Sequence, residues 1–98
     1  MADNASPLLE RELEVVNPDG LHTRPAAAIA DAMRSFDARL TVANVRTGAD
    51  ARALNGPIAV MLLDAKLGDR IAVTAEGPQA QAAIDALSAL VSGGFGEL

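Results

Sequence analysis

The side chain best suited to chemistry in this 98-residue sequence is its single histidine, His22. It lies in the segment Gly20-Leu21-His22-Thr23-Arg24-Pro25-Ala26-Ala27. The preceding Asn17-Pro18-Asp19-Gly20 predicts a turn, because proline presets φ and glycine accepts positive φ. Pro25 suits the first turn of a helix, where its missing N–H costs nothing. The sequence therefore places His22 at or just before the N-terminus of a helix.

The start of a helix gives His22 surroundings that suit an anion. The first backbone N–H groups of a helix have no partner within it, and the helix dipole is positive there. Together with Arg24, these groups favour an uncharged imidazole whose nitrogen can act as a nucleophile, and they would hold the oxygens of a phosphoryl group. The alternative is a surface or capping histidine without chemistry, because one histidine near a helix start is a weak signal.

The motif Gly-Leu-His-Thr-Arg-Pro-Ala resembles the active-site signature of the HPr family, the histidine phosphocarriers of the bacterial phosphotransferase system. Further resemblance lies in three downstream segments, Val60–Lys66, Ala75–Gln79 and Ser92–Phe95. It extends over roughly residues 11–95 and is most like the nitrogen-related branch, NPr.

The resemblance implies a role for each residue of the motif. His22 would accept a phosphoryl group on its δ nitrogen and pass it on, and Arg24 would steady the phosphate. Thr23, Pro25 and Ala26 would form the phosphate-binding helix N-terminus. The donor would be an Enzyme I-type protein charged from phosphoenolpyruvate, and the acceptor an Enzyme IIA-type protein. The carrier itself would need no cofactor and no metal.

Composition narrows the class of protein further. The chain has no cysteine and only one histidine, so we expect neither disulfides nor a conventional zinc site. Its net charge of −5 argues against a nucleic-acid partner, which would need a basic face. No apolar stretch reaches membrane-spanning length, and residues 1–6 do not resemble a signal peptide. We therefore expect a cytoplasmic protein without membrane insertion.

The hydrophobic pattern predicts the elements that position His22. Alternating apolar residues predict four strands, at residues 10–17, 37–44, 49–53 and 70–76. Helical spacing and helix-start signals predict three helices, at residues 23–35, 57–63 and 78–91. We expect two buried helical stripes, formed by Ala26, Ile29, Ala30, Met33 and Phe36 and by Ala80, Ala83, Ile84, Leu87 and Val91.

The order β-α-β-β-α-β-α predicts an α+β fold, with three helices covering one face of a four-stranded antiparallel sheet. It fits the HPr-like open-faced β-sandwich, and the strand order 1-4-2-3 is carried over from that family. We expect a flexible N-terminal arm at residues 1–9, the HPr-like domain at residues 10–95 and a C-terminal tail at residues 96–98.

The second helix is a continuous apolar run that cannot bury every side in so small a domain. We expect Ile58, Leu62 and Leu63 to contribute to the core, and Pro57 and Met61 to remain available for a partner. Ile58 is a candidate for both roles. The full set of candidate partner contacts is Ala27, Arg34, Leu54, Pro57, Ile58 and Met61.

Departures from the family pattern concern regulation and partner choice. Many HPr proteins have a regulatory serine at the start of the second helix, where this chain has Gly56, so that phosphorylation switch cannot act at this position. Asp31 stands where sugar-branch carriers often have lysine. We expect Asp19 to face the turn backbone in an Asx-type role, because a carboxylate would repel a phosphoryl group.

Two other functions fit the same residues. One is the same carrier chemistry serving general sugar transport. The other is a non-catalytic regulatory module that binds a partner through the apolar patch around Pro57 and Met61. The pair His22 and Arg24 argues against a purely non-catalytic role.

Overall fold

The fold is taken from a computed structural model that describes residues 8–97. Its elements follow in the order β1 (Leu9–Glu14), α1 (Thr23–Met33), β2 (Arg39–Asn44), β3 (Arg52–Ala53), α2 (Pro57–Met61), β4 (Arg70–Glu76), α3 (Ala80–Ser92) and the 3₁₀ turn η2 (Gly94–Gly96). The expected N-terminal arm falls mainly in residues 1–7, outside the described residues. In the described part of the chain, no helix has the length and apolar character to cross a membrane.

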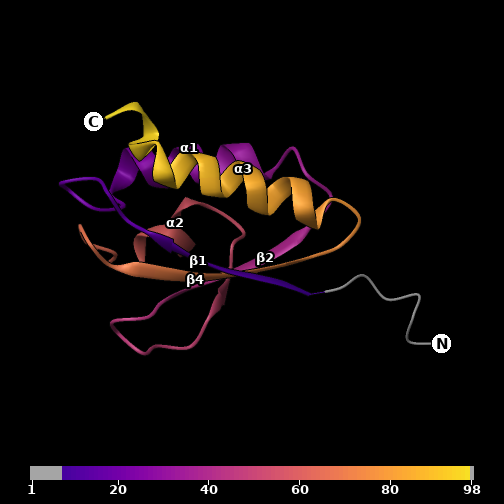
Figure 1. The fold of residues 1–98 in the computed structure, drawn as a ribbon, viewed down its shortest axis with the longest axis horizontal. Coiled ribbons are helices and arrows are strands. Elements are labelled where there is room, and N and C mark those ends of the chain that lie inside the picture. The colour runs from indigo at the N-terminus through magenta and orange to yellow at the C-terminus, as the bar shows by residue number, and fades with distance from the viewer. Residues whose placement is uncertain (1–7, 98) are drawn as a thin grey trace.

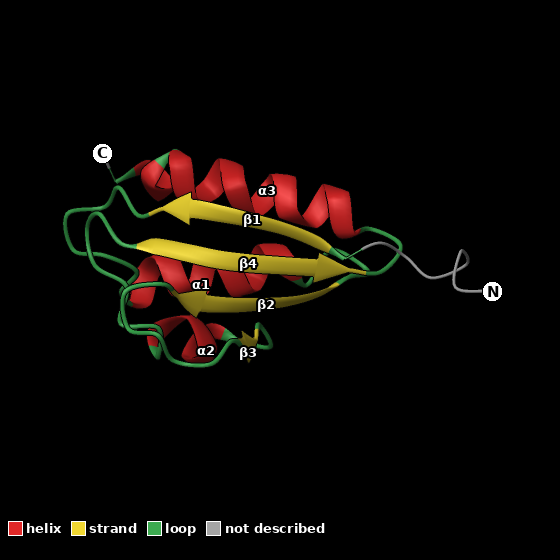
Figure 2. Ribbon diagram, turned by 60° about the horizontal axis from the view of Figure 1, so that its bottom comes forward, coloured by secondary structure: helices red, strands yellow, loops and turns green. Residues whose placement is uncertain are grey.

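The four strands form one antiparallel sheet in the order β1-β4-β2-β3, as the resemblance implied. Strand β4 occupies the centre of the sheet and pairs with β1 on one side and β2 on the other (Figure 2). Helices α1 and α3 run across one face of this sheet (Figure 1), and α2 packs beside α1. The α+β open-faced sandwich is thereby confirmed.

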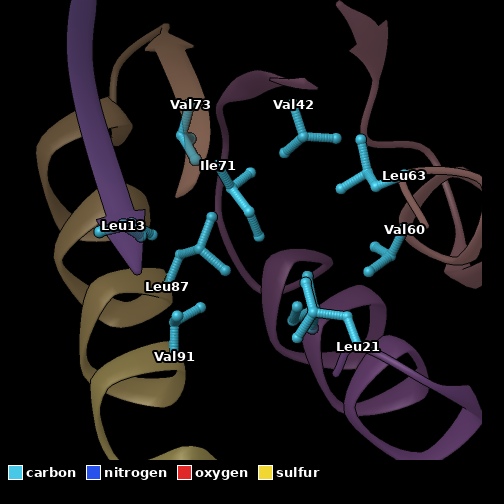
Figure 3. A pocket seen from close by; sticks show the side chains of 10 residues that line it. Leu13, Leu21, Val42, Val60, Leu63, Ile71, Val73, Leu87 and Val91 are labelled. Atoms are coloured by element: carbon cyan, nitrogen blue, oxygen red, sulfur yellow. The ribbon is translucent and has the colours of Figure 1, made fainter. Parts of the chain in front are cut away.

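The core fills the space between the sheet and the helices. All five predicted residues of α3 are buried, and Ile71, Val73 and Ala75 of β4 face them from the sheet. A cavity of about 10 Å³ remains between aliphatic side chains from both layers (Figure 3). It is at most the size of one water and has no polar lining, so it is a packing gap rather than a ligand site.

Several element boundaries differ from the predicted ones. Strand β1 ends at Glu14, because its partner β4 begins opposite that residue at Arg70. The N–H of Val15 instead bonds to the carbonyl of Asp69. Helix α1 ends at Met33, because beyond it the N–H groups of Ser35 and Phe36 bond to carbonyls three residues back. Strand β3 keeps only two residues of its predicted range.

Helix α2 turns a different face toward the core from the one expected. Ile58 and Leu62 are 68% and 58% exposed, so their predicted place in the core is wrong, whereas Leu63 is buried. Ala59 and Val60 are buried instead. Residues four apart share a helix face, so burying Ala59 and Leu63 turns Ile58 and Leu62 toward solvent.

Candidate functional site

The turn before α1 is held against the loop that follows α2. Gly20 has φ +69°, as the turn requires, and an added Cβ would lie 2.2 Å from the carbonyl oxygen of Ala65. The N–H of Leu21 donates to that same oxygen at 3.0 Å. Leu21 is buried in the core, so the residue that follows it is held at the rim of the molecule.

That next residue is His22, the N-cap of α1, as predicted. Its backbone is extended and its carbonyl accepts the N–H of Ala26 at 3.0 Å. The N–H groups of Thr23 and Arg24 find no acceptor among residues 8–97. Pro25 is buried and has no N–H to leave unpaired. An exposed imidazole thus projects beside two available N–H donors at the positive end of a helix.

A carboxylate that the sequence did not suggest also faces His22. The side-chain oxygens of Glu97 lie 3.3 Å and 3.4 Å from Nε2 of the imidazole. Asn17 fixes this carboxylate, because its Nδ2 donates to Oε1 of Glu97 at 2.7 Å and to the carbonyl of Gly94 at 2.8 Å. Glu97 reaches the site because the chain turns back after α3 through η2, where Gly94, Phe95 and Gly96 all have positive φ.

The imidazole opens onto a shallow hollow with mixed charge. Asp19, Met61, Asp64 and Lys66 line it together with His22 and its neighbours. Lys66 pairs with Asp64 at 3.2 Å. The predicted Asx role of Asp19 is not formed, since its carboxylate makes no hydrogen bond to the described turn backbone; the turn closes through the carbonyl of Asn17 instead.

The candidate phosphate-steadying side chain, Arg24, is exposed on the first turn of α1. It has no ionic partner within the described range. Its guanidinium is therefore not committed to another group of the described fold.

The candidate partner contacts gather around α1 and α2. Ala27 and Arg34 line a groove on α1 together with Pro57 of α2. Leu54 is half-buried in an adjoining groove, and Ile58 is exposed. Met61 joins this surface to the hollow of His22. Leu62, the residue that follows α2, is exposed as well, although the sequence predicts it in the core.

The loop bearing Lys66 is anchored by Asp69. The carboxylate of Asp69 accepts the backbone N–H of Lys66 at 2.9 Å, Nδ2 of buried Asn44 at 3.0 Å and Nε of Arg46 at 3.0 Å. These bonds favour the ionised form and lower the pKa of the Asp69 carboxyl to about 2, the Lys66 N–H having the largest effect.

Gly56 is the N-cap of α2. No side chain caps this helix. Gly56 also occupies the start of the second helix, where the family resemblance would place a regulatory serine.

The described residues contain no cluster of three or more histidine, cysteine, aspartate or glutamate side chains suited to hold a metal ion. The polar groups beside His22 instead include the backbone N–H donors of Thr23 and Arg24, which are suited to an anion.

Comparison with known proteins identifies relatives of this chain in sequence and in fold. The family model described as PTS HPr component phosphorylation site matches residues 9–93. The phosphocarrier protein NPr of Escherichia coli (strain K12) is 38% identical over 89 residues, 91% of this chain and 97% of its own. The phosphocarrier protein HPr of Vibrio cholerae is 36% identical over 84 residues, 86% of this chain and 95% of its own. The crystal structure of HPr-C-His from Thermoanaerobacter tengcongensis superposes with a TM-score of 0.82 at 29% identity, covering 92% of this chain and 98% of that one.

Proposed function

Because the chain belongs to the HPr family of phosphotransferase-system phosphocarriers, we propose that His22 is its phosphoryl acceptor. A phosphorylated Enzyme I, charged from phosphoenolpyruvate, donates the group, and an Enzyme IIA-type protein receives it. The relay belongs to the nitrogen-related regulatory system and operates in the cytoplasm. The chain is a carrier within this relay and not a stand-alone enzyme.

One observation carries the proposal: the exposed imidazole of the N-cap residue His22 lies at the start of α1, where the N–H groups of Thr23 and Arg24 have no acceptor among residues 8–97. Phosphoryl transfer needs alignment of donor and acceptor and stabilisation of charge on the equatorial oxygens. The two N–H groups and the Arg24 guanidinium supply that stabilisation, and the docked partners supply the alignment. Pro25 and Ala26 hold the first helical turn in place.

The partner surface is formed by Ala27 and Arg34 of α1 together with Pro57, Ile58 and Met61 of α2, with half-buried Leu54 at its edge. Exposed apolar side chains next to a reactive group favour a docking role, since a transient partner can cover them. Resemblance to NPr supports assignment to the nitrogen-related system. Asp31 of α1 supports it as well, since sugar-branch carriers often have lysine at this position.

The direct experiment is phosphorylation by purified donors. The protein is incubated with phosphoenolpyruvate and, separately, each Enzyme I paralogue of the source cell, and its intact mass is followed before and after acid treatment. We expect one acid-labile phosphate, absent from the His22→Gln variant. Faster reaction with the nitrogen-related Enzyme I supports that branch, and faster reaction with the sugar-transport Enzyme I indicates general sugar transport. If no donor phosphorylates the chain, the carrier proposal fails and a purely regulatory binding module is favoured.

Arg24→Ala tests the proposed phosphate contact. Removing a charge-assisted donor from a reacting phosphoryl group should slow transfer about 10- to 100-fold. The matched control is Arg39→Ala, which removes an arginine that is 84% exposed on β2. Rapid-quench measurement of the transfer rate decides the matter: equal rates for the two variants would exclude Arg24 from the site.

A further inference from the structure

We infer that Asn55 is a spontaneous modification site, where hydrolysis of the side-chain amide places a carboxylate beside the proposed docking surface. Asn55 and Gly56 form the only Asn-Gly pair of the sequence. They lie in the connection between β3 and α2 (Figure 2). The site itself rests on the exposure and bonding of these two residues, whereas its effect on docking rests on the proposed function.

The first step concerns access to the reacting groups. Asn55 is exposed, and its side chain makes no hydrogen bond to residues 8–97. The N–H of Gly56 has no acceptor in the same part of the chain. An added Cβ at Gly56 would meet no atom within 4 Å, so the space beside this residue is open. The Gly56 nitrogen is therefore not held away from the Asn55 amide by a bond or by a crowding side chain.

The second step is a ring closure followed by hydrolysis. The backbone nitrogen of Gly56 gives its proton to hydroxide and attacks Cγ of Asn55, forming a nitrogen–carbon bond. The bond from Cγ to the side-chain nitrogen breaks, and that nitrogen takes a proton from water and leaves as ammonia. Water then opens the cyclic imide at either carbonyl. The products are aspartate, or isoaspartate with an extra carbon in the main chain, and the overall reaction exchanges water for ammonia.

The other asparagines that the structure describes are protected from this reaction. Asn17 is completely buried and precedes Pro18, whose nitrogen has no proton to lose. Asn44 is 2% exposed, and both ends of its amide are hydrogen-bonded to backbone groups at 3.0 Å. Among the described asparagines, Asn55 alone combines an accessible amide with a following glycine.

The third step concerns the surface that receives the new charge. Asn55 lines the groove that also contains Arg34 and Pro57, two of the candidate partner contacts. Hydrolysis adds one negative charge to a chain whose net charge is already −5. Isoaspartate also lengthens the main chain just before α2, which exposes Ile58 and Met61. Both products should weaken docking of the phosphoryl donor, since a charge beside an apolar contact must be desolvated when a partner covers it.

The site is tested by incubating the folded protein in mildly alkaline buffer, which favours loss of the Gly56 amide proton. Intact mass should show the increase that replacing an amide by an acid produces, and peptide mapping should assign it to Asn55 and separate it from Asn4, which lies outside the described residues. A synthetic peptide of residues 51–60 gives the reference rate. We expect the folded chain to react within about tenfold of that rate, because Asn55 lies outside the helices and strands. A slower reaction would overturn the inference.

Gly56→Ala and Asn55→Gln are the matched variants. Gly56 has φ 166°, an extended conformation open to any residue, and room for a Cβ, so alanine should leave the fold unchanged. That Cβ should slow the mass increase at least about tenfold, because it hinders the adjacent nitrogen and restricts the backbone. Asn55→Gln keeps an amide but must close a larger ring, and should also react more slowly than the parent. Equal mass gain in the parent and both variants would overturn the assignment to Asn55.

The effect on docking is tested with a phosphorylated Enzyme I. Anion exchange separates the modified chains by their extra charge, and unmodified chains from the same incubation are the control. We expect KM to rise about threefold or more while kcat changes less than about twofold, because the groups at His22 are untouched. Equal KM values would overturn the effect on docking. If even the unmodified chains accept no phosphate, the proposed function fails instead, and the mass measurements still judge Asn55.

Discussion

Gly20 shows how closely a single residue controls the position of His22. The glycine combines positive φ with close approach to the Ala65 carbonyl, and both features would be lost with any other side chain. The turn, the helix start and the position of His22 at that start were predicted from neighbouring residues, because turn and cap signals are local. Glu97 was not predicted, because its contact with His22 depends on how η2 folds back.

Gly20→Ala should destabilise the fold by about 2 kcal/mol or more. The left-handed backbone costs a non-glycine residue about 1–2 kcal/mol, and overlap with the Ala65 oxygen adds to this. Gly48→Ala is the matched control, since Gly48 also has φ +69° but has nothing within 4 Å of an added Cβ. Chemical denaturation of both variants measures the difference. If both variants lost the same free energy of unfolding, close packing of the turn on the α2–β4 loop would contribute nothing to stability.

At the scale of the element, the helices differ in how far their sequences specify their faces. Every predicted core residue of α3 is buried, because its apolar residues follow the helical period. The unbroken apolar run of α2 contains no such period, so nothing local indicated which side would turn inward. Contacts of Val60 and Leu63 with the core decide the orientation and leave Ile58 and Met61 on the surface.

Met61→Glu should weaken docking of the phosphoryl donor. A carboxylate placed on an apolar contact loses buried area and must be desolvated, which we expect to raise KM for Enzyme I about tenfold or more. Leu8→Glu is the control, because Leu8 is 56% exposed just before β1, outside the hollow of His22. Steady-state phosphorylation kinetics compare the two. If Leu8→Glu raised KM as much as Met61→Glu, the weaker binding would come from added negative charge in general. Met61 would then not belong to the docking surface.

At the scale of the whole molecule, the strand order joins distant segments into one framework. The alternation of β4 predicted its bounds correctly, because a central strand with one buried face follows a strict period of two. Strand order itself came from the family resemblance, since strand pairings between distant segments leave no local signal. Loops at one end of the sheet are then joined by side chains such as Asp69, which links β2, the turn after it and the α2–β4 loop.

Asp69 should make the stability of the whole fold sensitive to acid. Its folded-state pKa of about 2 lies below the ordinary 3.8, so its contribution is complete above about pH 4. That contribution is lost as the pH falls from about 4 toward 2, because the carboxyl becomes protonated and the acceptor bonds weaken. Asp69→Asn should lower the free energy of unfolding at pH 7 and flatten its decline between pH 4 and pH 2. Urea denaturation at several pH values measures this; an unchanged slope would assign the acid sensitivity to other carboxyls.

The return of the chain through η2 has a practical consequence for attaching anything to this protein. Glu97 lies against the imidazole, so a purification tag or surface linker joined directly beyond it would emerge beside His22, the proposed phosphoryl acceptor. The start of β1, at Leu9, is the opposite end of that strand from the turn that leads to His22 (Figure 2). Fluorophores, affinity handles and immobilising linkers are therefore best joined ahead of β1, away from the imidazole of His22.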